Sequence, residues 1–343
     1  MAEYKGIKGF KVQSLASDPS TAVEGQVWYN TAGNALKFSG LTAGTWASGN
    51  TLNNPRTNNA GAGRTQTAAL ALGGNSTSTP SPPYSTVLTE SYDGSTWTET
   101  TDFTTARGYF HGCGPQTAAL ISTAETPGPY PTNTGDTEIW NGTAWTEVAN
   151  VNNIRVTATM QGTVTATLMA GGANAVTPSP TVDGETEDYN GTAWTEVGDL
   201  NTARWKSGSM TGGTPSASLV FGGETSPSPS DLVGIVESWN GTSWTETTDL
   251  GRARYGMGGA GTQDSGICFA GSPTAGGGTE GYTESWDGSS WTEVNDMVGA
   301  FSMGAYGGNT AASDAFAAGG GTSSNNSTEE WTKAVGTLTV TVT

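Results

Sequence analysis

One eight-residue pattern recurs along the chain and limits what the chain can fold into. It consists of an aromatic residue, Asn-Gly or Asp-Gly, two small residues, and Trp-Thr-Glu. Its five copies are Tyr92–Glu99, Trp140–Glu147, Tyr189–Glu196, Trp239–Glu246 and Trp286–Glu293. Asn-Gly or Asp-Gly between two strand-like stretches predicts a β-hairpin with a two-residue type I′ turn, because both central residues of that turn need a positive φ.

The predicted turn also sets a register for each hairpin. With a two-residue turn, Trp140 lies opposite Thr143, and Glu138 lies opposite Trp145. Since side chains alternate along a strand, both aromatic residues of a copy are expected on one face. Each hairpin then has an aromatic face that another part of the chain must cover.

The Trp that follows the turn marks a longer repeat of about 50 residues, which indicates one structural unit per copy. Ten residues after this Trp comes an Arg in five copies and Phe301 in the last, and a Glu precedes each hairpin aromatic by two residues. The six Trp residues, expected to pack between units, are Trp46, Trp97, Trp145, Trp194, Trp244 and Trp291. The Arg residues are Arg56, Arg107, Arg155, Arg204 and Arg254, and the Glu residues are Glu90, Glu138, Glu187, Glu237, Glu284 and Glu329.

The order of segments within a unit predicts four strands. A run of small residues such as Gly256–Gly261 suits an inner strand where sheets crowd together, and an apolar run such as Ile267–Ala270 is typical of a strand buried on both faces. A loop rich in Pro, Ser and Thr and the hairpin complete the unit. The 51 Gly residues and the lack of a helical apolar period favour an all-β fold.

The Gly-Gly pairs at 73–74, 171–172, 222–223 and 319–320, followed by a Glu, an aromatic residue and a Trp, resemble kelch repeats. This resemblance implies a six-bladed β-propeller over residues 28–335, with seven blades as the alternative if the end segments form an extra one. The second unit departs from the pattern with Ile121-Ser122, and the fifth with Gly271-Ser272. The sixth unit lacks the Asn-Gly turn and its Trp.

The missing Trp of the sixth unit and the surplus Trp46 predict how the ring closes. We expect Trp46 to supply the outer strand of the last unit, because pairing the two ends leaves no open sheet edge. Residues 1–27 are then an N-terminal docking arm. Residues 336–343 are a C-terminal strand without an assigned partner.

Composition excludes several classes of function. The net charge of −18 argues against nucleic-acid binding, which requires clustered Lys and Arg. No run is apolar and long enough to predict a membrane span or a secretory signal. Cys113 and Cys268 are far apart in the sequence and lack the close spacing of a metal-binding or redox motif. We favour two free buried thiols, with a disulfide between them as the alternative.

The Arg residues are the main candidates for chemistry. Each precedes an inner strand, so five of them could surround a central channel and bind an anion or a carboxylate. Alternatively, they pair with the Glu residues as structural ties between blades, which we favour. Phe301 interrupts the ring and leaves Glu329 without its own Arg, so a pocket is predicted there.

His111 is the only histidine, and alternation places Arg107, Tyr109, His111 and Cys113 on one face of a strand. A structural histidine is the simpler interpretation. Copper oxidases among kelch propellers need two His ligands, which this chain cannot supply. A sialidase-like hydrolase has no supporting motif. We therefore predict no enzyme activity, no catalytic residue and no cofactor or metal, while a metal in the acidic loops stays open.

Two further features point to recognition. The loops at 76–83, 177–182 and 226–231 vary while the frame repeats, and Tyr84, Tyr130 and Tyr282 lie in or near such loops, where binding residues concentrate. The segment from Glu24-Gly25-Gln26-Val27-Trp28-Tyr29-Asn30-Thr31 to Phe38-Ser39-Gly40 and Trp46 resembles a segment of phage virion and tail proteins, especially marine ones.

That resemblance implies a homo-oligomeric structural or attachment protein of the phage tail or fibre, located in the virion. The arm would bind other virion proteins, and the loops would recognise a host glycan or receptor. The alternative is a free carbohydrate-binding propeller.

Overall fold

The computed structural model describes residues 12–21, 23–76, 85–126, 132–174, 181–226, 231–273, 278–321 and 326–340. The chain divides into two compact units, which we call unit 1 (Met1–Gly44 and Lys333–Thr343) and unit 2 (Thr45–Thr332). Throughout the described ranges the secondary structure is β, and no helix there is long and apolar enough to cross a membrane.

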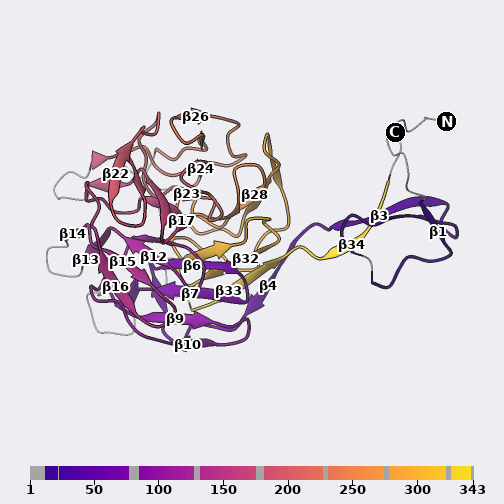
Figure 1. Cartoon of the computed structure of the whole chain (residues 1–343), viewed down its shortest axis with the longest axis horizontal. Coiled ribbons are helices and arrows are strands. Elements are labelled where there is room, and N and C mark those ends of the chain that lie inside the picture. The colour runs from indigo at the N-terminus through magenta and orange to yellow at the C-terminus, as the bar shows by residue number, and fades with distance from the viewer. Residues whose placement is uncertain are drawn as a thin grey trace. The chain divides into compact units, whose positions relative to one another are not determined.

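Unit 2 contains, in its described residues, six antiparallel four-stranded sheets, which we number 1 to 6 (Figure 1). Sheets 1 to 3 consist of β6 (Ala60–Thr65), β7 (Ala68–Leu72), β9 (Thr89–Tyr92) and β10 (Trp97–Glu99); β11 (His111–Cys113), β12 (Leu120–Ser122), β15 (Thr137–Trp140) and β16 (Trp145–Val148); and β17 (Thr159–Thr163), β18 (Ala166–Ala170), β21 (Thr186–Tyr189) and β22 (Trp194–Val197).

Sheets 4 to 6 continue the same order along the chain until the last strand. They consist of β23 (Gly208–Ser209), β24 (Ser218–Phe221), β25 (Val236–Trp239) and β26 (Trp244–Glu246); β27 (Gly258–Gly261), β28 (Gly266–Phe269), β29 (Thr283–Trp286) and β30 (Trp291–Glu293); and β31 (Ala305–Gly308), β32 (Asp314–Ala318), β33 (Thr328–Thr332) and β4 (Thr45–Gly49). Short two-stranded ladders join β5 (Arg56–Thr57) to β8 (Asn75–Ser76), β13 (Ala124–Thr126) to β14 (Thr132–Thr134), and β19 (Ala173–Asn174) to β20 (Thr181–Val182).

The first strands of the six sheets form a closed circuit. Strand β6 contacts β11, and contacts then continue through β17, β23, β27 and β31 back to β6. Figure 1 shows the outer strands β10, β22 and β26 at the periphery of unit 2, and β6, β17 and β23 further inward. The fold is therefore all-β, with small antiparallel sheets arranged as in a β-propeller.

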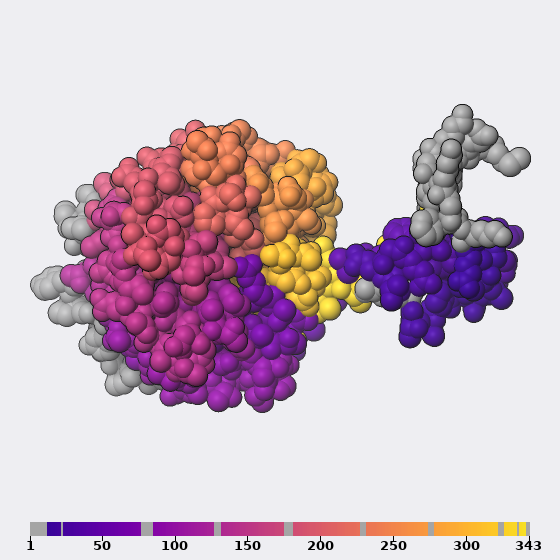
Figure 2. Space-filling model, in the orientation of Figure 1, coloured from indigo at the N-terminus to yellow at the C-terminus, as the bar shows by residue number. Residues whose placement is uncertain are grey.

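Small residues allow the first strands to approach this closely. A Cβ atom on Gly61 would lie 2.4 Å from the backbone nitrogen of Tyr306 in sheet 6, which only glycine avoids. The prediction that runs of small residues form inner strands is confirmed by β27, whose residues Gly258–Gly261 are all buried. In Figure 2, no opening through unit 2 is visible on the face shown.

The chain closes its sixth sheet with its own N-terminal strand. Strand β4 pairs with β33, and Trp46 lies directly opposite Trp331. The prediction that Trp46 supplies the outer strand of the last unit is confirmed, because this antiparallel ladder runs over five residue pairs.

The predicted hairpin turn is wrong, and the difference shifts the register. Trp140 lies opposite Trp145, and Glu138 lies opposite Glu147, so four residues rather than two form the loop. Gly142 has a φ of 95°, whereas Asn141 does not adopt a positive φ. The Asn141 side chain instead accepts hydrogen bonds from the backbone amides of Thr143 and Ala144, at 3.0 and 2.9 Å. This Asx turn replaces the type I′ turn.

The aromatic faces are covered by the neighbouring, preceding sheet, as the need to bury them predicts. Each hairpin aromatic packs on its own Trp, with ring centroids 4.7 to 5.5 Å apart across the six sheets. The Trp145 indole in sheet 2 donates a hydrogen bond to Thr89 Oγ1 in sheet 1, at 3.2 Å. The Trp46 indole likewise reaches Thr283 Oγ1 in sheet 5, at 3.1 Å. These Trp residues therefore join neighbouring sheets.

Unit 1 contains a separate four-stranded sheet, with the order β1 (Gln13–Leu15), β2 (Val27–Asn30), β3 (Ala35–Leu41) and β34 (Val335–Thr339). Strand β34 pairs with β3, which gives the C-terminal strand its partner. The expected domain limits are at residues 27/28 and 335/336, whereas the two compact units divide at 44/45 and 332/333, because β2 pairs with β3 and β3 pairs with the C-terminal strand β34. The arm residues 1–11 and the terminal residues 341–343 lie outside the described chain.

Candidate functional site

The five repeated Arg residues are buried and ion-paired. Each side chain has a relative exposure of 0%, and each lies where the chain enters a new sheet. Its partner is the Glu of the third strand of that sheet. The pairs are Arg56–Glu90, Arg107–Glu138, Arg155–Glu187 (3.3 Å), Arg204–Glu237 (3.0 Å) and Arg254–Glu284 (2.6 Å).

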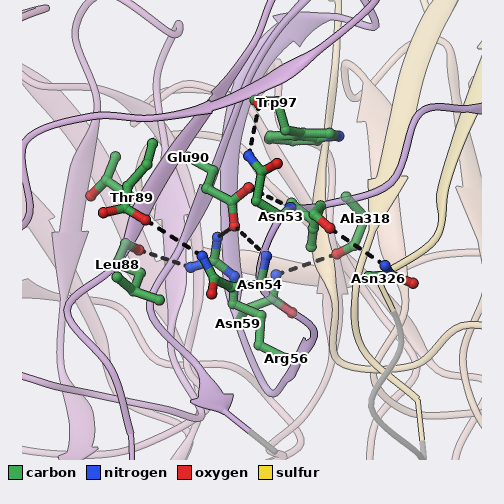
Figure 3. A network of polar contacts seen from close by, with 12 residues as sticks. Asn53, Asn54, Arg56, Asn59, Leu88, Thr89, Glu90, Trp97, Ala318 and Asn326 are labelled. Atoms are coloured by element: carbon green, nitrogen blue, oxygen red, sulfur yellow. Dashed lines mark hydrogen bonds and ion pairs between the residues drawn. The ribbon is translucent and has the colours of Figure 1, made fainter. Parts of the chain in front are cut away.

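The same Glu residues also hold the segments that connect the sheets. Glu90 accepts a hydrogen bond from the backbone amide of Asn53 at 2.8 Å (Figure 3). Besides its ion pair with Glu90, Arg56 donates a hydrogen bond to the Leu88 carbonyl at 2.9 Å. Glu187 accepts the amide of Asn152 at 2.8 Å in the same way. Burial lowers the pKa of Arg56, and Glu90 opposes this effect. These guanidinium groups therefore tie inter-sheet segments to the sheets and do not face a ligand.

The sixth copy replaces this pair with an apolar contact. Phe301 is fully buried in the cluster that contains Trp46 and Phe269. Glu329 accepts the backbone amides of Val298 (2.9 Å) and Gly299, and burial raises its pKa while these two hydrogen bonds oppose the rise. Phe301 occupies the space next to Glu329, and the cavity described below does not include either residue.

A cavity lies instead at the centre of the six sheets. Its volume is about 40 Å³, and its walls come from the beginnings of the first strands and the residues before them. All six sheets contribute one residue from the same repeat position, two residues after the Arg or Phe301. We call these six residues the rim: Asn58, Tyr109, Thr157, Lys206, Gly256 and Met303.

The rim has an unusual backbone conformation. All six residues have φ between 52° and 68°, in the left-handed region that favours glycine, and only one of them is glycine. Backbone hydrogen bonds link neighbours along the rim. They run from Tyr109 N to Asn58 O (3.0 Å), Thr157 N to Tyr109 O (2.9 Å), Gly256 N to Lys206 O (2.8 Å) and Met303 N to Gly256 O (2.9 Å).

Lys206 is the cation of the rim, and its position is fixed. Its Nζ lies 2.8 Å from Glu224 Oε2 and 3.9 Å from the centroid of the Trp205 ring. The centroid of the Tyr255 ring lies 5.0 Å from the same Nζ atom. The ammonium group is thus neutralised by one carboxylate and held by two aromatic faces.

His111 lines the cavity, but the expected alternation of four residues is wrong. Tyr109 has a φ of 56°, so it precedes the strand in a left-handed conformation and only His111–Cys113 are extended. Burial lowers the pKa of His111 to about 4, which makes the imidazole neutral at pH 7. Cys113 faces Thr167 at 3.4 Å, and burial raises its pKa to about 11.

The cysteines do not form a disulfide. Cys113 and Cys268 are both free and buried, which confirms the interpretation as two unpaired thiols. In the described ranges, no group of three or more His, Cys, Asp or Glu side chains could hold a metal ion. Tyr282 is described and its hydroxyl contacts Glu293 at 3.1 Å, whereas Tyr84, Tyr130 and most of the variable loops lie outside the described residues.

Sequence reasoning did not find the rim. The rim position lies two residues after an almost constant Arg and differs in all six copies, where it carries an amide, phenol, hydroxyl, ammonium or thioether group or is glycine. The positions directly before and after it also differ in every copy, so variation in the sequence does not single out the rim.

Comparisons with known proteins give a fold and no family. No protein-family model matches the chain, and no curated protein matches it. A solved structure entitled "Structure of YjhT" is similar over 84% of this chain and 99% of its own, with a TM-score of 0.62 and 11% sequence identity. At this identity the likeness shows a shared fold alone.

Proposed function

We propose that this protein is a non-enzymatic attachment component of a phage virion, in which unit 2 recognises a ligand and unit 1 binds other virion proteins. Unit 2 is then a six-bladed kelch-like propeller, with sheets 1 to 6 as its blades. The closed circuit of first strands supports six blades, and the fourth strand supplied by β4 completes the last one. The sheet of unit 1 has its own strand order, β1-β2-β3-β34, which supports six blades rather than seven.

The observation that carries a recognition role is the division of labour within the repeat. The constant Arg and Glu residues are buried and paired, so the constant part of the repeat stabilises the frame. The six rim residues, which all differ from one another, line the central cavity. A rigid repeated scaffold with variable residues at one place is typical of binding proteins.

Unit 1 has features that suit a docking element. Its sheet is organised around Trp28, whose buried indole donates a hydrogen bond to Asp18 Oδ1 at 2.9 Å. Val23, Val27 and Tyr29 expose 69%, 44% and 36% of their surface. The resemblance of this segment to phage virion proteins supports a site in the tail or fibre and a homo-oligomer, since virion parts follow the symmetry of the particle.

A free carbohydrate-binding propeller is the second candidate. The central cavity supports it as much as it supports an attachment protein of the virion, because both would bind a ligand there. A hydrolase that uses the Arg ring is less favoured. Such an enzyme needs Arg groups that reach the substrate, whereas these five side chains are buried against Glu.

Quantitative mass spectrometry of purified particles from the source culture tests the virion assignment. We expect this chain at a fixed copy number that is a multiple of three or six. Its presence only in the lysate or the cell, and not in particles, would contradict the virion assignment and favour the free carbohydrate-binding propeller.

A further inference from the structure

The rim keeps side chains where the backbone favours glycine. Five of its six residues are not glycine, and Thr157 is β-branched, for which a left-handed conformation is a marked outlier. Gly256 occupies the equivalent place in sheet 5, with a φ of 68°, and makes the same kind of backbone hydrogen bond. Glycine is therefore sufficient for the fold, and the five side chains are retained at an energetic cost, which is typical of functional positions.

The rim side chains offer both donors and acceptors of hydrogen bonds. The Tyr109 phenol lines the cavity, and burial raises its pKa, so the phenol keeps its proton and can donate it to a ligand. The Lys206 ammonium has three protons, and Glu224 accepts one of them. The neutral imidazole of His111 and the amide oxygen of Asn58 can accept. A hydroxyl group, which donates and accepts at once, matches this mixture.

Charge and size restrict the ligand further. The ion pair of Lys206 with Glu224 has no net charge, and the whole chain carries −18, so an acidic ligand is disfavoured. The cavity of about 40 Å³ holds roughly three water-sized groups. It can admit one substituent of a sugar ring, while the ring itself lies at the rim, where Tyr109 and Met303 provide apolar surface.

We propose that the rim binds the terminal residue of a neutral glycan and that one of its hydroxyl or hydroxymethyl groups enters the central cavity. This inference rests on the recognition role proposed above and names its ligand. It assigns specificity to the rim rather than to the Arg ring or to the variable loops.

The test measures the binding of four methyl glycosides to the full chain by saturation-transfer NMR and by calorimetric titration. The sugars are glucose, galactose, mannose and N-acetylglucosamine. We expect at least one of them to bind at millimolar concentration. The variants Tyr109→Gly, Thr157→Gly and Lys206→Gly should each weaken binding by about tenfold or more, which corresponds to the loss of a ligand contact. Thr157→Gly should melt at or above the wild-type temperature, because glycine suits this backbone. Lys206→Gly should melt at a lower temperature, because Glu224 stays buried without its cation, so binding is recorded below the melting temperature of each variant.

Asn34→Gly is the matched control. Asn34 is exposed in unit 1 and has a φ of 47°, so glycine relieves the same type of conformation away from the cavity. This variant should bind the glycoside as the wild type does. Binding that survives all three rim substitutions, binding of glucuronic acid in preference to every neutral sugar, or no binding of any neutral glycoside would overturn the inference. Each of these results is independent of whether the chain is found in particles.

Discussion

Trp46 and Trp331, which come from opposite ends of unit 2, lie directly opposite each other in neighbouring strands, with ring centroids 5.5 Å apart. Trp46 also packs against Phe269 of sheet 5 at 4.9 Å, and its indole reaches Thr283. The contact therefore joins the two chain ends of unit 2 and also fastens sheet 6 to sheet 5. With β4 in place, each of the six sheets of unit 2 has four strands, and no sheet is left one strand short.

Trp46→Ala should destabilise the protein as much as Trp145→Ala. Both side chains are 8% exposed and pack on a partner Trp, so each substitution should lower the free energy of unfolding by about 3–5 kcal/mol. Urea unfolding, followed by Trp fluorescence, measures both. A chain that lacks residues 1–50 and is as stable as the wild type would contradict the closure.

Arg107→Met should destabilise the protein by about 3–5 kcal/mol, because Glu138 would stay buried without its cation. The double variant Arg107→Met/Glu138→Gln should recover much of this loss. Its neutral amide oxygen can still accept the Thr104 amide, which lies 2.9 Å from Glu138 Oε2. Equal stability of the single and double variants, measured by thermal unfolding, would argue against the buried pair.

Tyr189→Phe should leave stability unchanged or raise it by up to about 1 kcal/mol. The Tyr189 side chain is fully buried, and its hydroxyl has no hydrogen-bond partner in the described structure. At the equivalent position, the Trp239 indole donates to the Pro215 carbonyl at 2.8 Å.

Tyr92→Phe is the control for this substitution, because the Tyr92 hydroxyl donates to Glu330 at 2.5 Å. This variant should lose about 1–2 kcal/mol. A loss of stability in Tyr189→Phe equal to that in Tyr92→Phe would show that the Tyr189 hydroxyl has a partner.

His111 should titrate with a pKa of about 4 in the folded protein. Because this pKa lies below the unfolded value of about 6.5, the unfolded chain binds the proton more tightly, and the His111 contribution to stability is lost as the pH falls from 6.5 to 4. Since His111 is the only histidine, its imidazole resonances can be followed by NMR without assignment. A midpoint near 6.5 would mean that the imidazole is open to water.

The frame could be predicted from the sequence because its determinants are local and repeated. The hairpin aromatics, the Arg and the Glu recur at fixed spacing. The Arg–Glu ion pairs and the closure of the last sheet by Trp46 could therefore be predicted from the positions of these residues. The hairpin register was missed because the Asn141 side chain, and not the φ preference of Asn-Gly, determines the loop. The partner of β34 was missed because its pairing with β3 spans nearly the whole chain.

The rim could not be predicted because left-handed φ at residues such as Thr157 and Met303 contradicts their local preferences. Only the packing of six sheets around one centre imposes it. Variation at a repeat position is visible in the sequence, but without the fold it does not tell a binding residue from a tolerant one.

The central claim is that the repeated Arg residues build the frame and the rim residues bind, and a comparison of Arg155 with Thr157 tests it most directly. These residues lie two positions apart, one buried against Glu187 and the other at the cavity. Melting temperature and glycoside affinity should be measured for Arg155→Met and Thr157→Gly, with binding recorded where each variant is folded. We predict that Arg155→Met melts at a clearly lower temperature and still binds, whereas Thr157→Gly melts like the wild type and binds about tenfold more weakly or not at all. The reverse pattern would contradict the account.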